Sequence, residues 1–354
     1  MRIIDRYIAV TVACYVIAAL FVLVILQMAF GFLDEMGDVG KGSYTAGKAA
    51  YYIAMTTPNR VYEMFPLAAL IGSLLGLGAM AGSSELTIIR ASGVSVYRIV
   101  FSVIKIGIIL SALTFTIGEW LSPPINSFAR SYRADAISER LSVTVNGSFW
   151  LKDGDRVVSV RQAISKDVLA DIVIYRYSND RQLQAIISAP KAQHSESGWV
   201  LADAAITRFN SNGVTVDKGQ DYIWHGGFQP ENIEVVSSRP DYLSLKKLWE
   251  YIGYQQKNGL ESAKYELAFW NKLASPFSTM VMLIISIPFV FGSLRSVGTG
   301  QRLMLGIVLG IGYFLISRIL STSGVVYELN PVFCAFFPLM LFLFPGLFAI
   351  YRVE

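Results

Sequence analysis

The most reactive-looking motif in the 354-residue sequence runs from Gly42 to Ala49 and reads Gly-Ser-Tyr-Thr-Ala-Gly-Lys-Ala. It matches the phosphate-binding loop until its last position, where that loop needs a Ser or Thr hydroxyl to hold Mg²⁺. Ala49 has no hydroxyl, and no strand-like segment precedes the motif. We therefore expect its glycines to turn the chain, and we expect Lys41 and Lys48 to meet lipid head groups or water.

Residues for metal or nucleophile chemistry are few. Cys14 and Cys334 lie in apolar stretches, where a free thiol behaves as a small hydrophobic group. His194 and His225 have no second ligand at metal-binding spacing, so we expect both at the surface. No Ser-Lys dyad, Cys facing a base or pair of intramembrane aspartates is visible. The sequence predicts that the chain binds no cofactor or metal and is not itself an enzyme.

The segment 83–93 is a candidate for binding a partner. Ser83 or Ser84 can cap a short helix that has Glu85 in its first turn, and Leu86 shares a face with the isoleucine three residues later. Such a helix would offer a charged end and an apolar stripe to a second protein. A simple connector, in which Glu85 serves only the helix dipole, fits the same residues.

Long apolar stretches dominate the chain. A bilayer core about 30 Å thick needs roughly 20 residues of helix to cross it. Stretches of this length run from Ile8 to Leu33, Val61 to Ala81, Val96 to Leu121, Leu267 to Phe291, Leu303 to Leu320 and Val332 to Ile350. With 53% hydrophobic residues and a mean hydropathy of +0.48, the chain is predicted to be a polytopic membrane protein and not a soluble enzyme. The expected domains are residues 1–122, with three spans and the helix near 83–93; 123–266, a polar insertion; and 267–354, with three further spans.

Basic residues predict the orientation, because short loops rich in Arg and Lys stay in the cytoplasm. One side of the predicted membrane carries Arg2, Arg6, Arg90, Arg98, Arg295, Arg302 and Arg352. Both termini are therefore expected in the cytoplasm and the insertion in the periplasm. The first span has no small-residue cleavage site and is expected to stay as an anchor. The net charge of +4 is spread along the chain and gives no reason to expect nucleic-acid binding.

The insertion shows the two-residue period of β-strands, separated by turn clusters. Strands are expected at Phe149 to Leu151, Arg156 to Val160, Val168 to Tyr177, Gln182 to Ala189, Trp199 to Phe209 and Val214 to Trp224. This pattern indicates an antiparallel sandwich or jelly roll. Both faces of the segment from Ile172 to Tyr177 are apolar, which fits a central strand or the wall of an apolar groove.

A helix is expected after the strands. Ser244 can cap an amphipathic helix that stops before Gly259 and leads the chain back to the membrane. Its aromatic residues Trp249, Tyr251 and Tyr254 suit a membrane interface or an ordinary core-facing helix.

Seven short segments, spread over nearly the whole chain, stand in a recognisable order. They are Asp5-Arg6-Tyr7-Ile8, Gly42-Ser43-Tyr44, Ser84-Glu85-Leu86, Ala91-Ser92-Gly93, Gly118-Glu119-Trp120, the run from Ala129 to Ala134 and the run from Phe291 to Val297. In this order and with three spans on each side of the insertion, the chain resembles the LptF/LptG permeases, and LptG-type members more than LptF-type ones. These are membrane subunits of the ATP-driven exporter that extracts lipopolysaccharide from the inner membrane of Gram-negative bacteria. The resemblance implies a polytopic α-helical membrane protein of six transmembrane helices with an inserted all-β periplasmic jellyroll-like domain.

The resemblance also implies partners. It implies pairing with an LptF-type permease around a lipid-holding cavity, a dimeric LptB-type ATPase that binds ATP and Mg, and LptC-type and LptA-type jellyroll proteins that receive the lipopolysaccharide. The residues that would then contact the ATPase are Glu85, Leu86 and Arg90. Lining of the cavity is expected from Phe30, Phe65, Ile311 and Leu315.

Phosphates on such a lipid attract Arg and Lys near the outer surface of the bilayer. The candidates are Lys41, Arg130, Arg133, Lys264, Lys272 and Arg318. Arg318 is preferred because a charge within a span usually faces a cavity or a partner, although snorkelling to head groups also explains it. The family often has lysines at the outer end of the first span, where this chain has Gly31, Asp34, Glu35 and Asp38. The sequence therefore leaves open whether span one contributes to phosphate binding. Glu119 fits either a buried hydrogen-bonding group or a residue at head-group level.

Two other functions fit parts of the sequence. A lipoprotein-releasing or mechanotransmission-type permease also couples a periplasmic domain to an ATPase, but it typically has four spans. A non-transporting scaffold or sensor would use the β domain only for docking and would tolerate charge reversal at Glu85.

Overall fold

The computed structural model describes residues 3–137, 145–165, 167–178, 182–195, 198–210, 213–225, 239–291 and 298–352. The chain divides into two compact units. The first consists of residues 1–37, 50–126 and 263–354, and the second of residues 38–49 and 127–262. The domain limits expected from the sequence stay a prediction.

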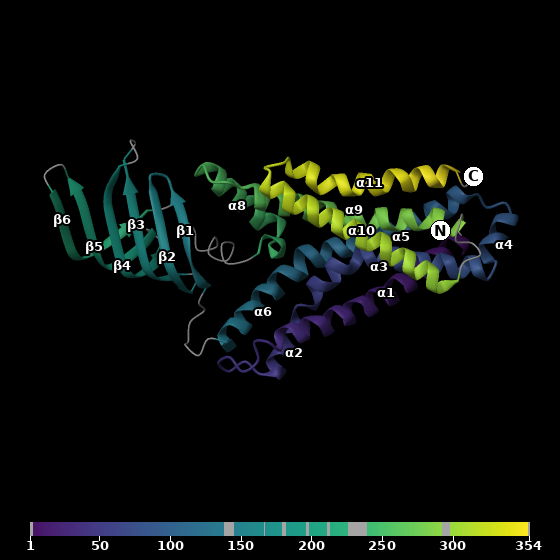
Figure 1. The fold of residues 1–354 in the computed structure, drawn as a ribbon, viewed down its shortest axis with the longest axis horizontal. Coiled ribbons are helices and arrows are strands. Elements are labelled where there is room, and N and C mark those ends of the chain that lie inside the picture. Colours follow the sequence, from purple (N-terminus) through teal and green to yellow (C-terminus); the bar gives the residue numbers. More distant parts are fainter. Residues whose placement is uncertain are drawn as a thin grey trace. The chain divides into compact units, whose positions relative to one another are not determined.

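The first unit is a bundle of long helices (Figure 1). Among the described residues, six helical stretches are long and apolar enough to cross a membrane. They are α1 (Ile3–Glu35), α3 (Thr57–Gly82), the continuous run of α5 (Val96–Thr116), the π-helical η1 (Ile117–Leu121) and α6 (Ser122–Ile137), then α9 (Ala263–Phe291), α10 (Thr299–Val326) and α11 (Pro331–Arg352). The predicted 3+3 arrangement of spans is confirmed.

The third stretch runs further than the sequence suggested. We expected the polar insertion to begin at Pro123, but α6 continues the helix to Ile137. The preceding π-turn has a wider hydrogen-bonding pattern than an α-helix. In the turn that follows, the helix does not need a backbone N–H from every residue, so proline, which has none, is tolerated. Pro123 and Pro124 therefore follow η1 without ending the helix.

Helix α3 packs against α1, α9 and α10. Glycines make two of these contacts close: a Cβ on Gly72 would lie 2.4 Å from the Cα of Val16 in α1, and a Cβ on Gly310 of α10 would lie 2.0 Å from Leu67 Cδ1. The sequence alone does not show which helix each of these glycines packs against. Around these contacts lies a buried apolar core that includes Val16, Leu70, Leu74, Leu77, Met282 and Ile287.

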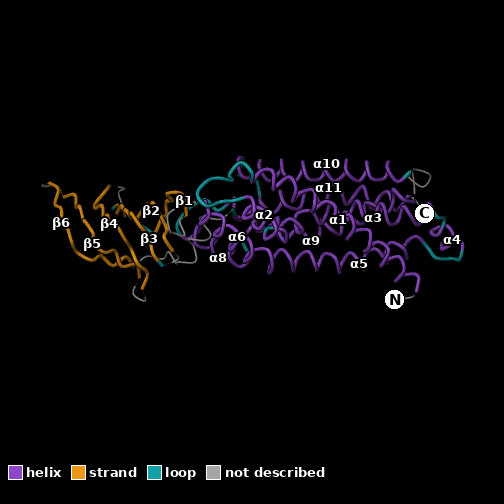
Figure 2. Tube along the Cα trace, turned by 90° about the horizontal axis from the view of Figure 1, so that it is seen from below, coloured by secondary structure: helices purple, strands orange, loops and turns teal. Residues whose placement is uncertain are grey.

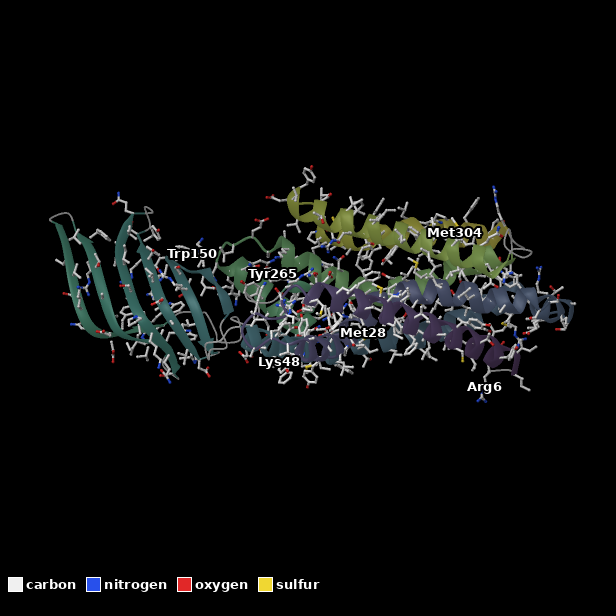
Figure 3. All side chains as sticks on the ribbon, turned by 60° about the horizontal axis from the view of Figure 1, so that its bottom comes forward. Arg6, Met28, Lys48, Trp150, Tyr265 and Met304 are labelled. Carbon is white, nitrogen blue, oxygen red and sulfur yellow. The ribbon has the colours of Figure 1, made fainter. Side chains whose placement is uncertain are left out.

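Burial divides the spans into central and peripheral helices. In the most apolar windows of α3 and α9, 67% and 61% of residues are buried, compared with 28% in α1 and 11% in α10. Met304, on the outer side of α10, points away from the bundle (Figure 3). The exposed surfaces of α1 and α10 are therefore apolar surfaces that need lipid or another protein to cover them.

Two short helices belong to the loops between spans. They are α2 (Ala46–Met55) and α4 (Glu85–Ala91). The helix ends nearest the two termini, the start of α1 and the end of α11, lie at the same end of the bundle as α4 (Figures 1 and 2).

The second unit contains an antiparallel sheet whose six described strands follow one another in sequence order. The strands are β1 (Val145–Asp153), β2 (Arg156–Ser165), β3 (Val168–Tyr177), β4 (Leu183–Ser195), β5 (Gly198–Asn210) and β6 (Gly213–Trp224). All six strands expected from the sequence are present, and the fold class is confirmed. The buried side of the sheet is apolar and includes Val158, Ile172, Ile174, Ile187, Trp199 and Trp224.

The two-faced strand predicted from Ile172 onwards lies between β2 and β4. Ile172 and Ile174 are fully buried, while Tyr175 on the other face stacks on Trp150 with ring centroids 5.8 Å apart. An interior position in the sheet explains both apolar faces.

Helix α8 (Leu245–Lys257) begins as predicted, because the Ser244 hydroxyl accepts a hydrogen bond from the Lys247 N–H at 3.3 Å. The buried face of α8 includes Leu248 and Ile252. Tyr254 donates a hydrogen bond to the Lys152 carbonyl at 2.9 Å, and burial together with the charge of Asp153 raises the pKa of Tyr254 to about 12. Tyr254 therefore contributes to the packing of the second unit, in agreement with the core-facing alternative.

Candidate functional site

Helix α4 lies where the sequence predicted a short helix, but its start differs. Ser84 occupies the N-cap position with a left-handed backbone (φ 63°) and makes no side-chain capping bond. Instead, the Ser83 hydroxyl donates to Glu85 Oε1 at 2.9 Å. The predicted serine cap is therefore wrong, because the turn after α3 points the Ser84 side chain away from the free N–H groups of α4.

The apolar stripe of α4 faces the bundle. Leu86 is 2% exposed and belongs to the bundle core, with Ile89 packed against the same core. The expectation that Leu86 contacts a partner is therefore corrected. Its burial against the bundle core holds this short helix in place. Ile88 is 67% exposed, and Thr87 and Arg90 are also exposed, so a partner could reach these side chains of α4.

Glu85 is tied to the first span, which sequence reasoning missed. The Tyr7 hydroxyl of α1 donates to Glu85 Oε2 at 2.9 Å, across 78 residues of sequence. Nearby in sequence, Asp5 of α1 pairs with Arg98 of α5 at 3.2 Å. The shared motif Asp5-Arg6-Tyr7 was the available signal, but no local pattern indicates which residue Tyr7 contacts.

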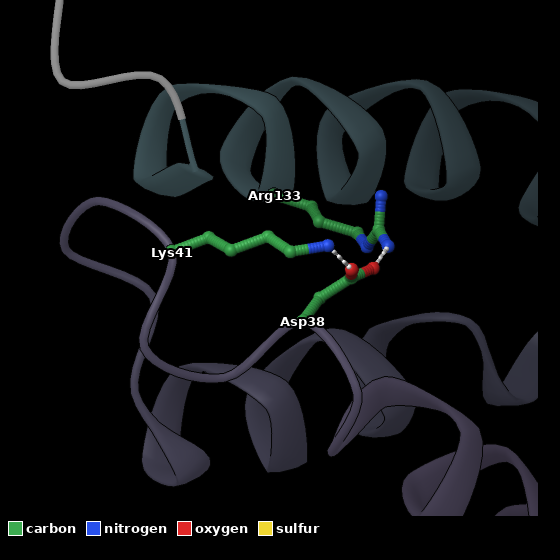
Figure 4. Close-up of polar contacts among 3 residues, drawn as sticks. All are labelled: Asp38, Lys41 and Arg133. Atoms are coloured by element: carbon green, nitrogen blue, oxygen red, sulfur yellow. Dashed lines mark hydrogen bonds and ion pairs between the residues drawn. The ribbon is translucent and has the colours of Figure 1, made fainter.

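Two of the candidate phosphate-binding cations meet at one carboxylate (Figure 4). Lys41 pairs with Asp38 Oδ1 at 2.5 Å, and Arg133 of α6 pairs with Asp38 Oδ2. The hydrogen bond from Lys41 holds the pKa of Asp38 below its ordinary value, and the charge of Arg133 acts in the same direction. At neutral pH the cluster of Asp38, Lys41 and Arg133 thus carries two positive charges and one negative charge.

The glycine-rich motif adjoins this cluster. Gly42 has a positive φ of 54°, and a Cβ there would lie 2.4 Å from the Ile137 carbonyl oxygen. The Ser43 N–H donates to the Ala136 carbonyl at 2.8 Å, and Lys48 Nζ donates to the Ser43 hydroxyl at 2.8 Å. The glycine turns the chain against α6, as the sequence indicated. Figure 3 labels Lys48, whose side chain is partly buried.

Arg130 lies one turn before Arg133 on α6. Its guanidinium stands 4.1 Å from the centroid of the Tyr242 ring, within the range of cation–π attraction.

Lys272 does not behave as the sequence suggested. Its side chain is 6% exposed, and its ammonium pairs with Glu119 of η1 at 3.2 Å inside the first unit. The assignment of Lys272 to lipid phosphates is corrected, because a buried lysine needs a carboxylate partner and Glu119 supplies it. The same contact makes Glu119 a buried partner of α9, one of the two roles that the sequence left open.

The other candidates lie on separate surfaces. Lys264 and Arg318 are exposed side chains of α9 and α10. Phe30, Ile311 and Leu315 are exposed by 66%, 49% and 52%, and their place in a cavity lining stays a prediction. Phe65 is 1% exposed and lies in the core between helices, so its predicted place in the cavity lining is corrected.

The sequence matches a known protein family and is similar to two proteins of that family. Residues 6–352 match the model of the family described as lipopolysaccharide export system permease LptF/LptG. The chain is 33% identical over 341 residues to the lipopolysaccharide export system permease protein LptG of Haemophilus influenzae, covering 96% of this chain and 95% of the relative. It is 33% identical over 353 residues to the protein of the same name from Escherichia coli strain K12, covering 99% and 98%.

Proposed function

Since the chain belongs to the LptF/LptG family of lipopolysaccharide export system permeases, we propose that it is a membrane subunit that moves lipopolysaccharide out of the inner membrane of a Gram-negative bacterium. The observation that carries this conclusion is the match along residues 6–352, which includes both sets of spans and the inserted sheet. The six candidate spans among the described residues also argue against the four-span permeases of related design.

An external energy source follows from the cargo. Exposing buried acyl carbon to water costs about 0.8 kcal/mol per CH₂, so one chain of roughly a dozen carbons costs on the order of 10 kcal/mol. The glycine-rich motif lacks the hydroxyl for Mg²⁺, and its Lys48 already bonds to Ser43. We therefore assign ATP and Mg to a dimeric LptB-type ATPase and no cofactor to this chain.

The lipid path needs a second permease subunit. The exposed apolar surfaces of α1 and α10 fit an LptF-type partner, with Phe30, Ile311 and Leu315 lining a cavity between the two subunits. From this cavity the lipid passes to LptC-type and LptA-type jellyroll proteins, and the β domain of this chain lies on their side of the membrane.

The orientation rests on the basic loops and on the bundle. Both helix ends nearest the termini lie at the end of the bundle that carries α4 (Figure 1). We place this end in the cytoplasm of a multi-pass inner-membrane protein and the second unit in the periplasm. Helix α4 is then on the side where the ATPase binds.

Roles for individual residues follow. Glu85, Ile88 and Arg90 contact the ATPase, while buried Leu86 fixes α4 to the bundle. The cations that bind the phosphates of the lipid are Lys41, Arg130, Arg133, Lys264 and Arg318. Lys272 is left out of this set because Glu119 already occupies it.

The test is ATP-driven release of lipopolysaccharide from proteoliposomes that contain this chain, its permease partner and the ATPase. Glu85→Lys reverses the charge at the start of α4, and Glu261→Lys makes the same change at an exposed position in the second unit. We expect Glu85→Lys to lose both ATPase binding and lipid release, and Glu261→Lys to keep both.

The outcomes separate the candidate functions. Undiminished release with Glu85→Lys would remove this residue from the mechanism. No release from a verified wild-type assembly would contradict export and favour a scaffold or sensor.

A further inference from the structure

Arg302 is a buried arginine at the beginning of α10. Its side chain is 6% exposed, and its Nη1 donates to the carbonyl oxygen of Gly78, 224 residues earlier in the sequence. Gly78 lies near the C-terminal end of α3, where the helix dipole concentrates negative charge. A guanidinium is therefore well matched to this site, and its burial makes it a firm contact between α10 and α3.

Two glycines one turn apart make room for this guanidinium. A Cβ on Gly78 would lie 2.7 Å from both Cδ and Nη1 of Arg302, too close for the side chain to stay. A Cβ on Gly82 would lie 4.0 Å from Nη1, an ordinary contact distance. The fit thus depends on Gly78 and tolerates a methyl group at Gly82.

The contact lies beside the helix that the proposed function assigns to the ATPase. Helix α3 ends at Gly82, and α4 begins at Glu85. On the other side of this corner, Tyr7 joins Glu85 to α1. The start of α4 is therefore linked to α1 by one polar contact, and the end of α3 to α10 by another.

We propose that Arg302 is a positioning residue that transmits movement of the α3–α4 corner to α10. This inference rests on the proposed function. A buried guanidinium held by a backbone carbonyl resists separation, so when α4 follows the ATPase, the start of α10 moves with the end of α3. Helix α10 suits this role because it is the least buried span, and Gly306 and Gly310 let it lie close against α3 further along.

The experiment compares Gly78→Ala with Gly82→Ala in the complete exporter, reconstituted in proteoliposomes. Both variants add one methyl group to the same helix, but only the first displaces Arg302. The measurements are ATP hydrolysis and lipopolysaccharide release in the same samples. For Gly78→Ala we expect hydrolysis to continue while lipid released per ATP falls at least about fivefold, the range of a typical coupling energy. For Gly82→Ala we expect the wild-type ratio.

Arg302→Lys is the second variant, for the case that Gly78→Ala does not assemble. A lysine can still donate to the Gly78 carbonyl but cannot fill the space between the two glycines, so we expect an intermediate ratio of release to hydrolysis. An unchanged ratio in the assembled variants would overturn the proposal. A parallel fall of hydrolysis and release in the assembled variants would overturn it too, because the lipid released per ATP is then unchanged. Failure of the wild-type complex to release lipid would instead contradict the proposed function itself.

Discussion

Asp38 sets how much positive charge the cluster with Lys41 and Arg133 can offer an anionic lipid. Its carboxylate satisfies both cations at neutral pH. Because its pKa is lowered by the hydrogen bond from Lys41, the paired state is present above the ordinary titration range of a carboxyl group. It is lost as the pH falls through the lowered pKa of the folded protein, which releases two cations.

This predicts pH-dependent binding of an anion. The probe is a sulfated glycolipid in vesicles, since a sulfate ester keeps its charge at acidic pH. We expect the affinity of the full chain for this lipid to stay level from neutral pH through the ordinary carboxyl range and to rise only below it. Asp38→Asn is the control, and it should bind the lipid more tightly at neutral pH and show a smaller rise. A rise of equal size in both proteins would show that other carboxyl groups cause it.

Lys272 and Glu119 form a buried ion pair in which each charge compensates the other. Removing one partner of such a pair typically costs about 3–5 kcal/mol, because the other charge is left buried without compensation. We expect Lys272→Met and Glu119→Gln each to lower the thermal unfolding temperature of the detergent-solubilised chain.

The double variant tests the pairing directly. With both charges removed, the chain should be more stable than with Lys272→Met alone. A double variant whose loss equals the sum of the two single losses would show that the two side chains do not interact.

Among the elements, α3 holds the bundle together because small residues let α1 and α10 approach it. Among the glycines of α3, Gly72 lies closest to α1, and any side chain there would contact the backbone of Val16 and the Tyr15 carbonyl oxygen. Backbone atoms cannot move aside as a flexible side chain can, so overpacking here displaces the whole of α1.

We therefore predict that Gly72→Leu destabilises the chain by about 1–3 kcal/mol or more. Gly312→Leu is the matched control, because a Cβ at Gly312 of α10 meets nothing within 4 Å among the described residues. Thermal unfolding in detergent should separate the two variants clearly. Equal unfolding temperatures would mean that α1 and α3 do not pack as closely as the structure places them.

At the scale of the whole molecule, the proposed membrane orientation predicts that α4 and the sheet are accessible from opposite sides of the membrane. Thr87 is exposed on α4, and Lys191 is exposed on β4. In a chain with Cys14→Ser and Cys334→Ala, we expect Thr87→Cys to react with a membrane-impermeant maleimide only after the inner membrane is opened. Lys191→Cys should react in cells whose outer membrane alone is permeable. Labelling of both residues from the same side would contradict the proposed orientation.

Cysteine reactivity in the unmodified chain adds a check within the bundle. Cys14 is exposed on α1, whereas Cys334 is buried on α11 beside Gly324. A lipid-soluble maleimide should therefore modify Cys14 first in the isolated chain and lose that preference if α1 is covered by the partner permease.

The sequence by itself determined the six spans, the six strands and the α8 cap, and the order of its short motifs indicated the family. The spans, the strands and the cap each depend on a local property: the length of an apolar stretch, a period of two residues, or a serine placed before a helix. The pattern is readable without knowledge of the rest of the chain, because the spacing of apolar residues in a segment shows whether it suits a helix or a strand.

Only the tertiary structure decided which partner each of several side chains has. Lys272 met Glu119 instead of a lipid, Leu86 and Phe65 entered the core, Glu85 bonded to Tyr7, and Arg302 bonded to Gly78. These contacts join residues far apart in the sequence, and any of the charged groups could have been satisfied by solvent, lipid or another partner. Which partner each obtained depends on which helix faces lie together, and the local sequence does not contain that information.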